Sequence, residues 1–230
     1  VVNSDTYQNS AGESLSQRDD SNISCITIPT KNLRRELKRE DLVGHFDLII
    51  IDGEGSMHEH SRAALEICDY FVVPVKPSQF DLNSYVKYMA SVIEPVSEYK
   101  DLRGGVVLNE CEKDAASKET LAALKEFTVP VFENHINRSK TTRNASGLGL
   151  SVTEYSLQNA CGANVFSFVK ELCEAAQLKV RNFTILELRR LSLRRKNKKK
   201  ESTHAGRKNN QKKTNYSSSD TETSNFFGRG

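Results

Sequence analysis

Hydrophobic residues in the first 178 positions gather in short β-rich runs that alternate with longer segments of helical spacing. The run Leu48-Ile49-Ile50-Ile51 has no polar residue inside it and ends at Asp52. An unbroken run of this kind is typical of a strand that helices cover on both faces, as in a parallel sheet. We expect strands at residues 1–2, 23–28, 46–51, 70–75, 105–108 and 129–132.

The segments between these strands predict helices at residues 31–42, 59–67, 82–98, 115–127 and 159–176. Thr30 and Asp81 are the expected N-caps of two of them. Residues 147–150 are interpreted as a loop before a strand at Val152-Thr153. Strands and helices in regular alternation predict an α/β fold, a doubly wound and mostly parallel sheet.

Charge divides the chain into an acidic part and a basic tail. Residues 179–230 hold 15 Lys and Arg against 4 Asp and Glu, a net charge of +11, which leaves −8 for residues 1–178. Beyond a few apolar residues that could form one or two amphipathic turns, the tail is rich in Lys, Asn, Ser and Gly. Such a composition cannot bury enough apolar surface to order itself. We therefore predict one globular domain at 1–178 and a disordered tail at 179–230.

Composition also narrows the compartment. The sequence has no apolar run near 18 residues and no charged-then-apolar leader, which predicts a protein with no membrane partner. The five cysteines never approach the spacing of a CxxC pair. We interpret them as reduced residues of a cytoplasmic protein rather than as disulfides or metal ligands.

Four segments, in this order, carry a resemblance to a known family: residues 1–15, 27–55, 64–82 and 104–110. Together they resemble the ParA family of plasmid and chromosome partition ATPases, the ParA/MinD branch of the P-loop NTPases. The resemblance covers residues 1–176. It implies a P-loop NTPase fold and ATP with Mg²⁺ as the cofactors.

The resemblance places the Walker B aspartate at Asp52, where it would hold Mg²⁺ through a water. A hard divalent cation keeps most of its waters and is surrounded by carboxylates and phosphates. Gly53 and Gly55 then match the segment that senses the γ-phosphate, with Glu54 standing where relatives have a small residue or proline. Without the resemblance, a structural role for Asp52 as a turn acid or helix N-cap is as good an interpretation as metal binding.

Two further positions match the family less closely. Asp5 aligns with an acid near the attacking water, although an alternative alignment puts Ser4 and Thr6 in the acidic positions. A polar turn that caps the next helix is the plainer interpretation. Asn109 matches the asparagine that reads the adenine edge, because an amide offers a donor and an acceptor together. The alternative interpretation of Asn109 is an ordinary turn at a strand end.

The sequence departs from the family in one respect, because it contains no Gly-Lys-Ser or Gly-Lys-Thr. A P-loop needs that motif to hold the phosphates and the metal. In the family this loop follows a strand beside the Asp52 strand. We therefore expect a chain that lacks that strand, with an open apolar slot in its sheet and marginal stability. We also expect it to be inactive in ATP hydrolysis as it stands.

Basic residues indicate where the protein would meet DNA. Arg138, Lys140 and Arg143 match a basic stretch that serves DNA contact or dimer assembly in relatives, and could also be a solvated helix start. The tail carries the cluster Lys198, Lys199 and Lys200, which suits phosphate neutralisation, unless the tail is only a solvated extension.

The resemblance implies a nucleoid-associated partition ATPase. It would be a homodimer when nucleotide is bound, with non-specific DNA and a ParB-type protein as partners. Two alternatives stay open. One is a non-catalytic DNA-binding or adaptor remnant of this fold. The other is an ATP-dependent ligase of the cobyrinic acid or dethiobiotin synthetase type, for which the sequence shows no substrate motif.

Overall fold

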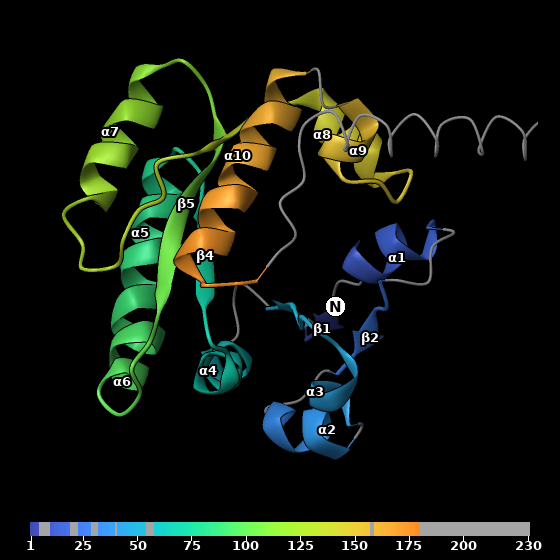
Figure 1. Ribbon diagram of the computed structural model, residues 1–230. Helices are drawn as coiled ribbons and strands as arrows, with labels where there is room; N and C mark the ends of the chain where they lie inside the picture. The colour runs from blue at the N-terminus through green and yellow to red at the C-terminus, as the bar shows by residue number, and fades with distance from the viewer. Residues whose placement is uncertain are drawn as a thin grey trace, which may run out of the picture. The chain divides into compact units, whose positions relative to one another are not determined.

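Six short parallel strands organise the residues described in the computed structural model, which are 1–4, 10–18, 23–28, 32–39, 41–53, 58–156 and 159–179 (Figure 1). In one sheet β1 (Val2–Asn3) lies between β2 (Ile26–Thr27) and β3 (Ile51–Asp52). In the other, β5 (Gly104–Cys111) lies between β4 (Phe71–Val75) and β6 (Ile136–Asn137). Every strand pairing is parallel, which confirms the α/β fold class.

Helices connect these strands along the chain. Their bounds are α1 Ser10–Ser16, α2 Leu33–Arg39, α3 Leu42–His45, α4 His58–Ile67, α5 Gln79–Tyr88, α6 Glu94–Ser97, α7 Ala115–Leu124, α8 Lys140–Ser146, α9 Val152–Ser156 and α10 Ala160–Ala175. The helix expected at residues 82–98 is in fact three consecutive pieces, because a π-helical turn, Met89–Ile93, joins α5 to α6.

The apolar run before Asp52 differs from the expectation. Only its last residue, Ile51, is in a strand, and Leu48 and Ile50 are 53% and 54% exposed. Ile49 and Ile51 pack instead against the buried cluster of Val2, Leu33 and Leu37. Successive side chains of an extended segment point to opposite faces, so one face of this run is packed and the other has little cover. The prediction of burial on both faces is therefore wrong for the described structure.

The strand that ends at Asp52 lies at the edge of its sheet. Among the described strands, β3 and β4 each lie at the outer edge of their own sheet, so the two are not neighbours. The helix that connects them, α4, contributes to both cores: Leu65 to the cluster around β4 and β5, and Ala63, Ala64 and Ile67 to the cluster around β1. The sequence predicts an open slot beside the strand of Asp52. That strand is β3, and one of its edges is open among the described strands.

The larger core surrounds β4 and β5. Val96, Val106 and Leu124 are fully buried there. A smaller cluster covers β5 at Val107, and in it the rings of Phe132 and Phe168 meet edge to face, 5.2 Å between centroids. The start of β5 needs glycines, because a Cβ on Gly105 would lie 2.6 Å from the Phe132 ring.

Two of the predicted strands, at residues 129–132 and 152–153, do not form in the described part of the chain. Residues 129–132 make only a single bridge, Val106 to Val131, and the third strand of this sheet is β6 instead. Residues 152–156 form helix α9 rather than a strand. Ser151 explains the helix, because its hydroxyl accepts a hydrogen bond from the Glu154 amide at 3.2 Å while the Glu154 carboxylate accepts one from the Ser151 amide at 2.8 Å. This reciprocal pair is a capping box.

The N-cap of α5 is also corrected. Ser78 occupies that position, and its hydroxyl oxygen accepts a hydrogen bond from the Asp81 amide at 3.1 Å. Asp81 lies in the first turn, and its carboxylate accepts a hydrogen bond from the Ser78 hydroxyl. A carboxylate there is favourable because it faces the positive end of the helix dipole. The other expected N-cap, Thr30, lies outside the described residues.

Candidate functional site

Asp52 stands at the carboxyl end of β3, beside the end of β1. The two strands are in register, with Asn3 opposite Asp52, and the Ser4 amide donates to the Asp52 carbonyl at 3.0 Å. The Asp52 side chain is exposed, as is Gly53, and a Cβ built on Gly53 would meet no atom within 4 Å. Ligands of open α/β sheets bind outside the carboxyl ends of the strands. Asp52 and Gly53 therefore occupy an accessible part of that edge.

Ser4 is held differently from its neighbour. It is 1% exposed, and its hydroxyl donates to the Asp52 carbonyl at 2.9 Å. A buried hydroxyl that is already bonded to the backbone fixes the end of β1 against β3 rather than facing a ligand. Asp5 and Gly55 lie outside the described residues, so their assignments stay predictions.

Charged side chains gather at the carboxyl ends of β4, β5 and β6. Lys76 follows β4, and its Nζ lies 2.9 Å from Oε1 of Glu110 on β5. Arg138 follows β6 and lies 3.0 Å from Glu112. The spacing of parallel strands brings these residues together although they are far apart in the sequence. These two ion pairs are not among the predictions from the sequence. The signal that could have found them is a charged residue directly after each of several consecutive strands.

Asn109 lies within β5 next to a backbone irregularity. The pairing with β6 shifts register between Asn109 and Cys111, and Glu110 has φ of 58°. A residue other than glycine is uncommon in that left-handed region, and such strain collects at functional sites. The Oδ1 atom of Asn109 accepts a hydrogen bond from the Glu110 amide at 3.0 Å. Reading an adenine edge with both amide groups would require that bond to be released or shared.

Helix α8 presents the basic residues expected to contact DNA. Ser139 caps it, with its hydroxyl accepting from the Thr141 amide at 3.1 Å. Lys140 and Arg143 are exposed on this helix. Arg138, also exposed, is paired with Glu112 and so is partly neutralised. The tail cluster, residues 198–200, lies outside the described residues.

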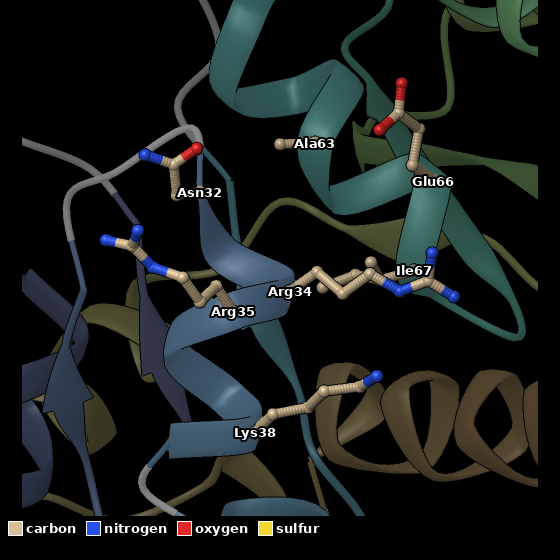
Figure 2. A pocket seen from close by; sticks show the side chains of 7 residues that line it. All are labelled: Asn32, Arg34, Arg35, Lys38, Ala63, Glu66 and Ile67. Atoms are coloured by element: carbon tan, nitrogen blue, oxygen red, sulfur yellow. The ribbon is translucent and has the colours of Figure 1, made fainter.

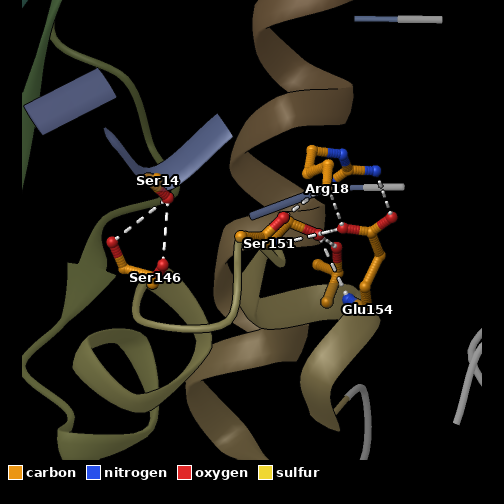
Figure 3. A network of polar contacts seen from close by, with 7 residues as sticks. Ser14, Arg18, Ser146, Ser151 and Glu154 are labelled. Atoms are coloured by element: carbon orange, nitrogen blue, oxygen red, sulfur yellow. Dashed lines mark hydrogen bonds and ion pairs between the residues drawn. The ribbon is translucent and has the colours of Figure 1, made fainter. Parts of the chain in front are cut away.

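A polar network fixes α1 against the segment from α8 to α9 (Figure 3). Arg18 makes two parallel hydrogen bonds to the Glu154 carboxylate, both 3.0 Å, and a third to the Gly149 carbonyl at 2.9 Å. The Ser14 hydroxyl donates to the Ser146 carbonyl at 3.0 Å. The only Gly with positive φ among the described residues is Gly149, where a Cβ would lie 2.6 Å from the Ser14 carbonyl oxygen. The helix with the basic residues is thereby tied to the helix that follows β1.

The residues present fit part of a magnesium nucleotide site. Among the described residues, no group of three or more His, Cys, Asp or Glu side chains could hold a metal by itself. Nucleotide-bound Mg²⁺ needs only one or two carboxylates besides waters and phosphates, and exposed Asp52 suits that role. The phosphate side does not fit, because the sequence has no Gly-Lys-Ser or Gly-Lys-Thr. None of the described helices is long and apolar enough to cross a membrane.

Compared by sequence, the chain matches no protein-family model and no curated protein. Compared by structure, it is similar to the septum site-determining protein MinD of Pyrococcus horikoshii, solved with Mg-ADP. The identity is 15% and the TM-score 0.60, over 79% of this chain and 85% of that one. A McdA–ATP complex from Cyanothece has 18% identity and a TM-score of 0.53, over 69% and 68%.

The MinD cell division protein of Aquifex aeolicus is similar as well, with 9% identity and a TM-score of 0.54 over 80% of this chain and 85% of that one. At such identities the likeness concerns architecture. The chain has the fold of the ParA/MinD-type P-loop ATPases, as the order of its motifs predicts.

Proposed function

We propose that this protein acts in DNA segregation as a ParA-type partition ATPase. ATP would favour a dimer that binds DNA without sequence preference, and a ParB-type partner would stimulate hydrolysis and release. The observation that carries the proposal is the exposed Asp52 carboxylate at the end of β3, within a fold shared with MinD and McdA. Two of those similar structures hold Mg-ADP and ATP.

Each candidate residue has a role in this proposal. Asp52 would hold Mg²⁺ through a water and so stabilise charge on the transferring phosphate. Gly53 would belong to the segment that senses the γ-phosphate. Asn109 would face the base, and Lys140 and Arg143 on α8 would neutralise DNA phosphates.

A second candidate is a non-catalytic DNA-binding or adaptor protein of the same fold. It is favoured by the absence of a Gly-Lys-Ser or Gly-Lys-Thr motif from all 230 residues. It keeps the basic residues of α8 and dispenses with the phosphate site. The two candidates differ in one measurable property, which is ATP hydrolysis.

The test uses the full chain and a fusion. The fusion joins the phosphate-loop strand of Pyrococcus horikoshii MinD to the amino end of this chain. We expect the chain alone to show no Mg²⁺-dependent hydrolysis and the fusion to show it. In the fusion, Asp52→Ala should lower kcat by about 10²-fold, with a much smaller loss of ATP affinity, because the metal matters most when charge shifts in the transition state. Asp101→Ala, an exposed acid after α6, is the matched control.

The outcomes separate the candidates. A fusion that binds ATP but loses kcat and affinity equally little with Asp52→Ala would return Asp52 to a turn acid. A correctly folded fusion with no nucleotide binding, while the full chain still binds random duplex DNA, would support the non-catalytic candidate. Turnover by the chain alone that Asp52→Ala abolishes would refute the expected inactivity.

The basic tail is tested separately. In the full chain, replacing Lys198, Lys199 and Lys200 together by Gln should weaken binding to random duplex DNA. The dependence of log affinity on log salt should flatten by about 0.9 for each phosphate that the tail no longer neutralises. An unchanged salt dependence would remove this cluster from the DNA-binding residues.

A further inference from the structure

Helix α2 carries a concentration of positive charge within the acidic part of the chain. Residues 31–39 contain five Lys and Arg and a single acidic residue, although residues 1–178 as a whole have a net charge of −8. Arg34, Arg35 and Lys38 are all exposed on this helix. They are not among the candidate DNA-binding residues named above.

The structure shows a hollow of about 410 Å³ beside this helix, between α2 and α4. Arg34 and Lys38 line it from α2, while Ala63 and Ile67 line it from α4. In Figure 2, Arg34 and Lys38 point to the same side of α2 and Arg35 points to the other side. Positions four apart on a helix are neighbours on its surface, so the two cations form a short basic edge along the hollow.

The acidic residues nearby are engaged elsewhere. Glu36 lies 3.3 Å from Arg35. Glu66, on the α4 wall, accepts a hydrogen bond from the Tyr99 hydroxyl at 2.7 Å and lies 3.8 Å from Arg62.

Among the described residues, no ion pair neutralises Arg34 or Lys38. Like charges four residues apart disfavour a helix slightly, so folding gains nothing from this pair of cations. Their arrangement is better explained by a ligand of negative charge than by stability.

We propose that Arg34 and Lys38 form a second DNA-contacting surface, which binds the sugar–phosphate backbone of duplex DNA. The choice of DNA as the anion rests on the function proposed above. Guanidinium and ammonium groups bind phosphate oxygens without reading sequence, and a DNA backbone offers phosphates at every register along a basic edge. An acidic peptide would have to match its carboxylates to these two positions. DNA also accounts for the exposed cations of α8 with the same ligand.

The experiment compares two full-chain variants that lose the same charge. Arg34→Gln with Lys38→Gln removes the basic edge of α2, and Lys118→Gln with Lys125→Gln removes two exposed lysines at α7. Affinity for a random-sequence duplex is measured by fluorescence anisotropy over a salt series. If each α2 cation neutralises one phosphate, the slope of log affinity against log salt becomes less negative by about 1.8 in the α2 variant. The α7 variant keeps the slope of the unmodified chain.

The charge-retaining variant Lys38→Arg is expected to keep the full slope, and urea unfolding of each variant shows whether the fold is retained. An unchanged slope in a folded α2 variant would overturn the inference while leaving DNA binding by α8 and the tail intact. Failure of the unmodified chain to bind duplex DNA at low salt would instead overturn the proposed function itself. Binding of poly-glutamate is measured on the same proteins. If the α2 variant loses this binding and keeps its affinity for DNA, the surface contacts an acidic protein partner and our proposal is refuted.

Discussion

The contact between Arg18 and Glu154 offers a direct test of how the segment that follows α1 docks on α9. The Arg18 side chain is 8% exposed and that of Glu154 is 23% exposed, so most of the pair is out of water. Two parallel hydrogen bonds of 3.0 Å join the guanidinium to the carboxylate. Arg18→Gln and Glu154→Gln remove each charge while they keep much of the side-chain volume.

The expected magnitude follows from this geometry. Removing one partner of a buried ion pair costs about 3–5 kcal/mol, because the other charge is left unpaired. Glu154 is partly exposed and also accepts bonds from the Ser151 amide and hydroxyl, so we expect each single variant to lose about 2–3 kcal/mol. The double variant leaves no unpaired charge. The coupling energy between the two positions should therefore be about 1–3 kcal/mol.

A double-mutant cycle in urea measures this coupling, with the slope of the unfolding free energy checked for each variant. The control is the pair Lys170 and Glu174 on α10, whose side chains are 68% and 69% exposed and 3.9 Å apart. Exposed pairs of that kind couple by about 0.5 kcal/mol or less. Coupling between Arg18 and Glu154 no larger than the control would refute the docking of Arg18 on α9 described above.

Two other changes test the packing of the sheets by urea unfolding. Ile49→Lys should cost about 2 kcal/mol or more because its side chain packs against the β1 cluster, whereas Ile50→Lys, at a position 54% exposed, should change stability by about 0.5 kcal/mol or less; equal costs would contradict the exposed face. Gly105→Ala should lose about 1–3 kcal/mol because its Cβ would lie 2.6 Å from the Phe132 ring, and Gly53→Ala, with open space around it, is the control.

The sequence predicts the alternation of elements well because that signal is local. The helices predicted at 59–67, 115–127 and 159–176 form as α4, α7 and α10, because their apolar residues repeat with helical spacing. Asp114 and Asn159 cap the amino ends of α7 and α10. The parallel sheet follows from strands separated by helices. These features depend on residues a few positions apart, which a single sequence displays.

The misses depend on residues far apart in the sequence or on a local signal that went unused. The Lys76–Glu110 and Arg18–Glu154 contacts join segments 34 and 136 positions apart, and no local pattern reports them. Helix α9 was available from the sequence, because Ser151 followed three residues later by Glu154 is a capping-box pattern. The β-branched Val152 and Thr153 favoured a strand instead, and the capping hydrogen bonds outweigh that preference.

For the candidate site, the position of Asp52 at a strand end is what the sequence predicts, and the neighbourhood of Asn109 is not. A strand followed by an acid is legible in the order of residues. The left-handed conformation of Glu110 comes from the register shift against β6, which is a property of pairing between strands. Pairing of that kind cannot be inferred from either strand alone.

The exposed face of residues 46–50 lies beside the strand edge to which the resemblance points. The resemblance puts the phosphate-loop strand beside the strand of Asp52, and that edge of β3 is open among the described strands. A strand added there would bring apolar side chains next to Leu48 and Ile50, which are now 53% and 54% exposed, and would place its loop near Asp52.

The burial of Ile50 and the affinity for ATP should therefore change together. In the fusion that carries the MinD phosphate-loop strand, Ile50→Lys should become costly, by about 2 kcal/mol or more, because a charge would then be buried without a partner. In the chain alone the same change should remain nearly neutral. Urea unfolding of the four proteins, with ATP affinity measured in parallel, makes the comparison. Restored ATP binding with Ile50→Lys still neutral would separate the two properties and show that the strand lies elsewhere.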